Sequence, residues 1–169
     1  MLKMVYFLPC LLRLKLKRAE MEIIRGNVFD AFLYPNSLVV HGCNAQGVMG
    51  SGVAKVVRND FPAAYYEYVR KYEESGLKLG DVIPVMVLPS RYIINAITQE
   101  FYGRDGRRYV NYHAIEACFG QVRKFVDQNG IETINYPKIG AGLGGGNWDE
   151  IAAIIDSQLE GYNHFVWEP

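Results

Sequence analysis

Residues 41 to 54 read His-Gly-Cys-Asn-Ala-Gln-Gly-Val-Met-Gly-Ser-Gly-Val-Ala, and the other elements of the chain are arranged around this segment. The apolar run that leads into it predicts a buried strand over residues 38–43. Gly47, Gly50 and Gly52 then let the backbone take positive φ angles and let a ligand approach it closely. A strand, a glycine-rich loop and a helix together present unpaired backbone N–H groups to an anion. We therefore expect this loop to bind a phosphate group; the alternative is a turn whose glycines serve packing alone.

The helix expected over residues 50–59 has no Asp or Glu in its first turn, so its N-terminus is electrostatically open to a phosphate. The pattern differs from both common phosphate loops. The chain contains no Gly-x-x-x-x-Gly-Lys-Ser/Thr, and no acidic residue follows the glycines by about twenty positions in a new strand. The sequence therefore predicts a phosphate-bearing ligand bound in some other way.

A second glycine loop occupies residues 137–148, Pro-Lys-Ile-Gly-Ala-Gly-Leu-Gly-Gly-Gly-Asn-Trp. It too follows an expected strand and precedes an expected helix, so in a parallel sheet both loops open at the carboxyl edge. Asn147 and Glu150 form a capping box that satisfies this helix start, which leaves the amides of 140–145 for an anion. Two such loops facing each other suit a pyrophosphate, whereas a mobile linker is the alternative.

Apolar spacing places the other elements. Strands alternate with helices and no repeat or low-complexity linker interrupts them, which predicts one three-layer α/β domain. The strands are expected at 21–25, 38–43, 82–88, 91–98, 133–136 and 164–167, and the helices at 50–59, 63–75, 111–128 and 148–159.

Composition narrows the class of protein. The 169 residues suffice for one domain, and the net charge of zero gives no support to nucleic-acid binding through bulk charge. The three cysteines, Cys10, Cys43 and Cys118, are odd in number and have no metal-site spacing. We therefore expect a reduced, cytoplasmic compartment and no metal site. We also expect no cofactor and a monomeric protein.

Residues 1–20 differ from the rest, because an apolar segment precedes a basic one, Arg13 to Arg18. A secretory signal has the reverse order, and the apolar part is too short to span a bilayer. We expect residues 1–20 to be an extension or the product of a mis-called start, with the domain spanning 21–169. A segment that binds a membrane surface or a partner is the alternative.

The combination of Gly26-Asn27-Val28, Gly47 to Ala54 after Asn44, and Ile139 to Leu143 resembles the macrodomain family over roughly residues 22–167. The resemblance is closest to the branch that contains the ADP-ribose-1″-phosphate phosphatase, the terminal ADP-ribose protein glycohydrolase and the DNA ADP-ribosyl glycohydrolase antitoxins. It implies a three-layer α/β/α fold with a mixed, largely parallel sheet.

The resemblance also implies a role for each segment. Asn27 and Val28 would lie beside the adenine, and Asn44 would face the distal ribose and its leaving group. The two glycine loops would hold the diphosphate from either side. The binding residues implied are Asn27, Val28, Asn44, Gly47, Val48, Met49, Gly50, Ser51, Gly52, Val53, Pro137, Ile139, Gly140, Ala141, Gly142, Leu143, Gly144 and Gly145.

Two positions depart from the glycohydrolases of this branch. Where they carry a lysine after the Tyr-Ile-Ile strand, this chain has Gln99, and where the protein glycohydrolase carries an aspartate, it has Gly144. An amide is not a comparable nucleophile, so a covalent intermediate of the lysine type is excluded at Gln99. Asn27 stands where many macrodomains have the aspartate that contacts the adenine.

The remaining chemistry rests on positioning. Asn44 would orient water while the loop amides stabilise the charge. His41 is a candidate base, although a histidine that ends a buried strand is more often structural. Arg104 or Arg107, in a polar turn, would meet a terminal phosphate, and His113 is expected to be structural or on the surface.

Three functions therefore stay open. The first is a metal-independent phosphatase that converts ADP-ribose 1″-phosphate to ADP-ribose. The second is a glycohydrolase of ADP-ribosylated protein or nucleic acid, the only one that would involve nucleic acid, and the departures at Gln99 and Gly144 weaken it. The third is a non-catalytic ADP-ribose reader, which needs only the two loops.

Overall fold

The protein is described here by a computed structural model of residues 21–169, so the expected extension 1–20 lies outside the described residues. The strands are β1 (Glu22–Arg25), β2 (Ser37–Asn44), β3 (Val82–Leu88), β4 (Arg91–Gln99), β5 (Thr133–Pro137) and β6 (His164–Glu168). The helices are the 3-10 helix η2 (Val28–Leu33) and the α-helices α1 (Gly52–Asp60), α2 (Pro62–Ser75), α3 (Tyr112–Asn129) and α4 (Trp148–Gln158). Each strand and α-helix expected from the sequence is present, with small differences at the ends.

The strands form one sheet in the order β1-β6-β5-β2-β4-β3. The central strand β2 pairs in parallel with β4 on one side and with β5 on the other. Only β3 runs antiparallel, as the hairpin partner of β4. The sheet is therefore mixed and largely parallel, as expected. Because β2 and β5 are parallel neighbours, the two glycine loops that follow them leave the sheet at the same edge.

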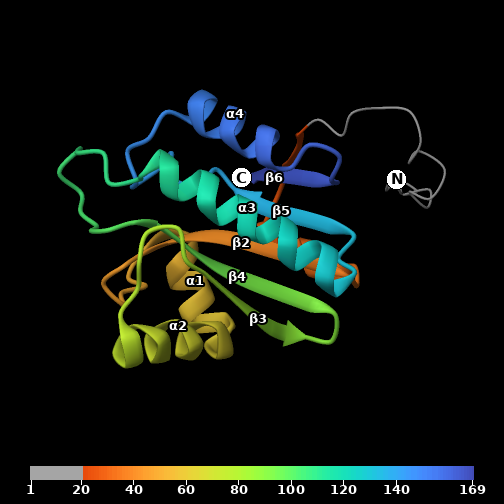
Figure 1. The fold of residues 1–169 in the computed structure, drawn as a ribbon, viewed down its shortest axis with the longest axis horizontal. Helices are drawn as coiled ribbons and strands as arrows, with labels where there is room; N and C mark the ends of the chain where they lie inside the picture. Colours follow the sequence, from red (N-terminus) through yellow and green to blue (C-terminus); the bar gives the residue numbers. More distant parts are fainter. Residues whose placement is uncertain (1–20) are drawn as a thin grey trace, which may run out of the picture.

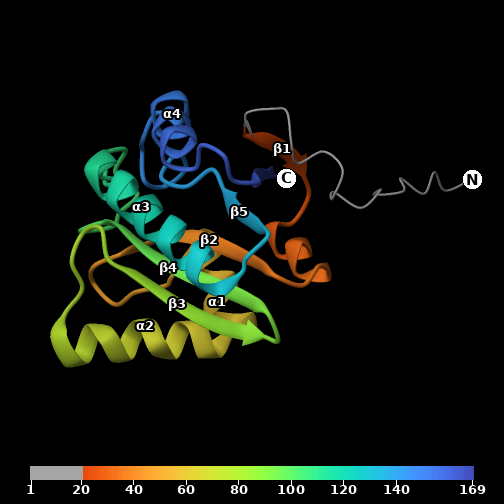
Figure 2. The same ribbon diagram turned by 45° about the vertical axis from the view of Figure 1, so that its right-hand side comes forward.

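Helices cover both faces of the sheet, with α3 and α4 on one face and α1 and α2 on the other (Figures 1 and 2). Successive side chains of a strand point to opposite faces, so β2 contributes to two cores. Leu38 and Val40 pack with α3 and α4, whereas Val39 and Cys43 pack with α1, α2 and η2. This arrangement confirms the three-layer α/β/α fold.

The segment after β1 contains a short helix that the elements expected from the sequence do not include. This is the 3-10 helix η2, and the Asn27 side chain caps it by accepting a hydrogen bond from the backbone N–H of Phe29 at 3.0 Å. Val28 is buried in the core beneath. The helix forms because Asn27 satisfies one of the amides that a helix start leaves unpaired.

The start of α4 is capped by Asn147, but only one half of the expected capping box forms. Asn147 Oδ1 accepts hydrogen bonds from the backbone N–H groups of Asp149 and Glu150 at 2.9 and 3.3 Å. The return bond expected from Glu150 is replaced, because the Asn147 N–H donates to the Tyr112 hydroxyl at 2.9 Å. The cap therefore also ties α4 to the start of α3.

Among residues 21–169, no helix has both the length and the apolar character needed to cross a membrane.

Candidate active site

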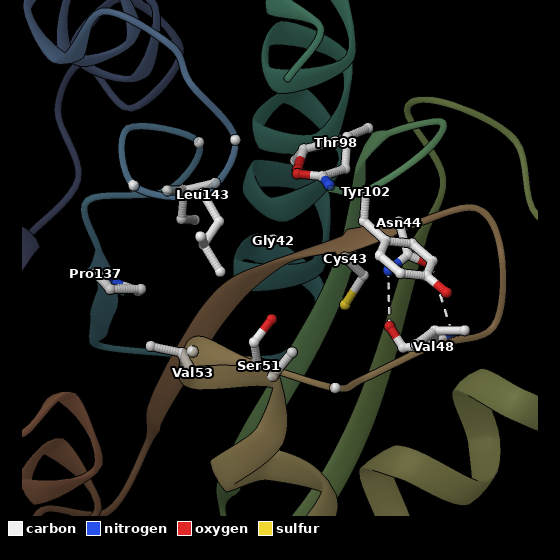
Figure 3. Close-up of a pocket in the computed structure, with 18 of the residues that line it drawn as sticks. Gly42, Cys43, Asn44, Val48, Ser51, Val53, Thr98, Tyr102, Pro137 and Leu143 are labelled. Carbon is white, nitrogen blue, oxygen red and sulfur yellow. Dashed lines mark hydrogen bonds between the residues drawn. The ribbon is translucent and has the colours of Figure 1, made fainter. Parts of the chain in front are cut away.

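A cavity of about 600 Å³ opens at the carboxyl edge of the sheet, between the two glycine loops. Figure 3 shows Ser51 and Val53 of the first loop on one side and Leu143 of the second loop on the other. The lining residues are Gly42, Cys43, Asn44, Val48, Gly50, Ser51, Gly52, Val53, Ala54, Thr98, Gln99, Tyr102, Gly103, Arg104, Pro137, Lys138, Ile139, Gly140, Gly142, Leu143 and Gly144.

The structure brings most of the expected binding residues together in this lining. Those that line the cavity are Asn44, Val48, Gly50, Ser51, Gly52, Val53, Pro137, Ile139, Gly140, Gly142, Leu143 and Gly144. Those outside the lining are Asn27, Val28, Gly47, Met49, Ala141 and Gly145. Asn27 Oδ1 caps the 3-10 helix η2, and Met49 is buried in the core.

Asn44 is held by a dense set of hydrogen bonds and does not extend freely into the cavity. Its Oδ1 accepts from the backbone N–H of Gln46 at 3.0 Å and from the Tyr68 hydroxyl at 2.9 Å. Its Nδ2 donates to the carbonyl oxygen of Val48 at 2.7 Å, a bond visible in Figure 3. Since an amide nitrogen carries two hydrogens, one remains for a ligand or water.

Helix α2 supports the first loop through two tyrosines that the sequence interpretation missed. The buried Tyr68 hydroxyl also donates to the Asn44 carbonyl oxygen at 2.7 Å. Gly47 has a φ of 74°, and a Cβ there would lie 2.6 Å from the Tyr72 ring. Gly47 therefore serves the close packing of the loop on α2. Tyrosines at helical spacing look like ordinary core residues, so no local signal marks this role.

The first turn of α1 offers unpaired amides to the cavity. The first backbone hydrogen bond of this turn runs from the Lys55 N–H to the Ser51 carbonyl oxygen at 3.2 Å. The preceding amides, of Gly52, Val53 and Ala54, have no partner within the helix, as at any helix start. All three residues line the cavity, and no acidic residue occupies the turn. This geometry is suited to a phosphate group.

The second loop is held in place by hydrogen bonds and differs from a mobile linker. The Gly144 carbonyl oxygen accepts from the N–H groups of Tyr109 and Val110 at 2.8 and 3.0 Å. The Gly146 N–H donates to the Gly140 carbonyl oxygen at 2.8 Å. A Cβ at position 144 would lie 2.7 Å from that same Gly140 oxygen. In this loop conformation, position 144 has no room for a side chain, including an aspartate.

Gln99, which stands where the related glycohydrolases carry a lysine, lies at the cavity. It is the Cα partner of Asn44 in the β2–β4 pairing, and it lines the cavity beside Asn44. Its Nε2 donates to the Phe101 carbonyl oxygen at 2.7 Å, so the side chain holds the following loop. The departure from the glycohydrolases therefore falls inside the site.

His41 does not reach the cavity. Its ring is buried, and its Nε2 lies 2.6 Å from the Oδ1 of Asn95. Burial lowers the pKa of His41 to about 4, partly opposed by the Asn95 hydrogen bond, so the ring is neutral near pH 7. We therefore withdraw His41 as a candidate base, and the geometry favours the structural role.

The lining has positive but no negative side chains. Among the described residues 21–169, Arg104 and Lys138 are its charged members, and none of the lining residues is Asp, Glu or His. Lys138 Nζ pairs with Glu168 at 2.7 Å, so Arg104 is the better candidate for an anion. Arg107 lies outside the lining and pairs with Asp105 at 2.6 Å. The structure thus separates the two arginines that the sequence left as alternatives.

Other potential chemistry is limited. Cys43 lines the cavity, but burial raises the pKa of its thiol well above the usual range, which disfavours a thiolate nucleophile. His113 lies on the surface at the start of α3, as expected, away from this lining. Within residues 21–169, no group of three or more His, Cys, Asp or Glu side chains is placed to hold a metal ion.

Comparisons with known proteins agree with this architecture. The Macro domain family model matches residues 40–155. The chain is 26% identical to an ADP-ribose 1″-phosphate phosphatase of Meyerozyma guilliermondii, over 88% of this chain and 99% of the relative. It is 28% identical to a DNA ADP-ribosyl glycohydrolase of Thermus aquaticus, over 88% of this chain but 41% of that relative.

A solved structure is similar over nearly the same range. The macrodomain of Thermus aquaticus DarG superposes with a TM-score of 0.73 and 28% identity, over 88% of this chain and 98% of that one. The family model covers more than half of the sequence and includes most of β2, both glycine loops and most of α4. From its sequence, fold and site together, the chain belongs to the Macro domain family.

Proposed function

We propose that the cavity binds ADP-ribose and that the protein hydrolyses ADP-ribose 1″-phosphate to ADP-ribose and phosphate. The diphosphate lies between the first turn of α1 and the second glycine loop. The distal ribose lies against Asn44 and Gln99, and the 1″-phosphate faces Arg104. The relatives named as phosphatases of this compound support the assignment.

The observation that carries the proposal is the charge of the lining. In the part of the chain that the structure describes, the lining combines unpaired amides and Arg104 with no carboxylate or imidazole. Phosphoryl transfer passes through a loose transition state, so positioning and electrostatic stabilisation provide nearly all of the catalysis. Water supplies the hydroxyl that stays on phosphorus and the proton that leaves on the C1″ oxygen. The free Nδ2 hydrogen of Asn44 positions the reacting groups, and Arg104 with the loop amides stabilises the phosphoryl oxygens.

Glycosidic cleavage is less well supported by the same lining. It uses a carboxyl group or another activated nucleophile near the anomeric carbon. Gln99 offers an amide, and position 144 has no room for an aspartate. A non-catalytic reader is the second candidate, since the absence of an acid or base from the lining suits binding without turnover.

Phosphate release from ADP-ribose 1″-phosphate tests the proposal. Replacing Asn44 by Ala is expected to lower turnover by about tenfold to a thousandfold, the scale of losing one positioning or oxyanion group. One arm contains a chelator, because the sequence predicts a metal-independent reaction. Asn129→Ala, at the end of α3 with its Nδ2 on the Phe125 carbonyl oxygen, is the matched control and should keep full turnover.

The melting temperature of each variant, with and without ADP-ribose, separates loss of catalysis from loss of fold. Wild-type protein that binds ADP-ribose without releasing phosphate would support the reader. Efficient removal of ADP-ribose from modified protein or DNA would instead favour the glycohydrolase and overturn the ranking.

A further inference from the structure

A buried hydroxyl in the cavity wall has no place in the function proposed above. Thr98 lies near the carboxyl end of β4, is 1% exposed and lines the cavity. Its Oγ1 has no hydrogen-bond partner among the described residues. A buried polar group without a hydrogen-bond partner lowers the free energy of unfolding, so this hydroxyl makes the free protein less stable.

An irregularity in the sheet brings Gln99 to the same cavity as Thr98. Thr98 itself follows the regular alternation from Ile94 and Ala96, which pack in the core beside α3 and α4. The β2–β4 pairing passes from Cys43 with Ile97 directly to Asn44 with Gln99, which leaves Thr98 as an extra residue. Regular alternation would send Thr98 and Gln99 to opposite faces, yet both line the cavity. A bulge re-aims side chains in this way and is common beside active sites.

The neighbouring strand leaves space for the hydroxyl. Thr98 lies beside Gly42 of β2 and Ile139 of the second loop, and Figure 3 labels both Thr98 and Gly42 around the cavity. A Cβ at position 42 would lie 2.9 Å from Thr98 Oγ1 and 3.1 Å from the Ile139 Cγ2. Any larger residue at position 42 would press on the hydroxyl, so Gly42 leaves the room that the hydroxyl occupies.

We propose that Thr98 is a specificity-determining residue whose hydroxyl hydrogen-bonds to an oxygen of the distal ribose of the ligand. The assignment rests on the proposed function, which places that ribose against Asn44 and Gln99, the pair at which the bulge ends. A hydroxyl both donates and accepts, so it can pair with a ribose hydroxyl in either direction. Binding then supplies the partner that the free protein lacks.

Calorimetric titration of Thr98→Val with ADP-ribose and with ADP tests the assignment. Valine keeps the shape and removes the hydroxyl. We expect ADP-ribose affinity to fall about threefold to tenfold, the scale of one neutral hydrogen bond, and ADP affinity to stay unchanged because ADP lacks the distal ribose. The melting temperature of the free variant should equal or exceed that of the wild type, because an unpaired buried hydroxyl has been removed.

Two further variants separate a ligand contact from a packing effect. Thr98→Ser restores a hydroxyl and should recover most of the ADP-ribose affinity. Thr133→Val makes the same change at the first residue of β5, at the end of that strand away from the cavity. There the Thr133 Oγ1 accepts a hydrogen bond from Asn135 Nδ2 at 3.3 Å. This control variant should bind ADP-ribose as the wild type does.

The outcomes are distinct. Unchanged ADP-ribose affinity in Thr98→Val would mean that a trapped water satisfies the hydroxyl, and an equal loss for ADP would place the contact on the diphosphate. Either result overturns this inference alone. Failure of the wild-type protein to bind ADP-ribose would overturn the proposed function and this inference together.

Discussion

At the scale of single residues, the site depends on a few polar side chains whose roles are set by their partners. Asn44 holds Val48 and Gln46 and is itself held by Tyr68. The sequence left His41 open as a candidate base or, more often for such a position, a structural residue, and burial makes it a neutral partner of Asn95. Its Asn95 partner in turn donates from Nδ2 to the Ala64 carbonyl oxygen at 2.9 Å, which ties β4 to α2.

Tyr68→Phe tests whether α2 positions Asn44. The change deletes the hydroxyl that donates to both oxygens of Asn44, and we expect a loss of about 1–2 kcal/mol in the free energy of unfolding. ADP-ribose affinity should also fall, because the Asn44 amide is no longer fixed. Urea unfolding and ADP-ribose titration provide the two measurements. Tyr66→Phe on the same helix, where the side chain is 66% exposed, is the control. Lower stability with unchanged affinity would limit Tyr68 to a core role.

At the scale of elements, the two glycine loops differ in how they bind anions. The first delivers the open N-terminus of α1, whose first turn has no acidic residue and whose N-cap residue Ser51 makes no side-chain cap bond. The second precedes a helix start that Asn147 already satisfies, so its contribution comes from the loop itself. That loop is shaped by the hydrogen bonds that the Gly144 carbonyl oxygen accepts from the N–H groups of Tyr109 and Val110.

A pair of alanine substitutions in the second loop tests this shape. Gly144→Ala places a methyl group 2.7 Å from the Gly140 carbonyl oxygen, and we expect this overpacking to cost about 1–3 kcal/mol of stability. Gly142→Ala meets no atom within 4 Å and should melt near the wild-type temperature. Thermal unfolding of the two variants provides the comparison. Equal melting temperatures would show that the loop relaxes easily and that position 144 accepts a side chain.

At the scale of the whole molecule, the sheet order brings the site together. The parallel neighbours β4, β2 and β5 all end at one edge, and the lining comes from their carboxyl ends and from the segments that follow them. Residues 21–169 contain every element of this arrangement. We therefore propose that residues 1–20 are not needed for the fold or for ligand binding.

Removing residues 1–20, so that the chain begins at Met21, tests this domain boundary. We expect the melting temperature and the ADP-ribose affinity to match those of the full chain, because the two cores and the cavity are built from residues 21–169. The full-length protein, measured in parallel by thermal unfolding and calorimetry, is the reference. A marked drop in either quantity would show that the segment packs on the domain.

The six strands, the four α-helices and the two glycine loops could be predicted from the sequence, whereas the 3-10 helix η2 was not predicted. Apolar spacing and glycine positions are properties of short windows, and they placed β2, α1 and the second loop within a residue or two. The amide-bearing turn of α1 was visible for the same reason, since the absence of Asp and Glu can be read from consecutive residues. The sequence also shows directly that Gln99 stands where the related glycohydrolases carry a lysine, and Gly144 where the protein glycohydrolase carries an aspartate.

The tertiary structure alone decided which side chains act together. Tyr68, Thr98 and Arg104 meet Asn44 or its cavity only because α2, β4 and the loop after β4 pack around β2. The bulge at Thr98 depends on strand register, and the neutral state of His41 depends on burial. Register, burial and pKa arise from contacts between residues far apart in the chain, and a local pattern does not encode them.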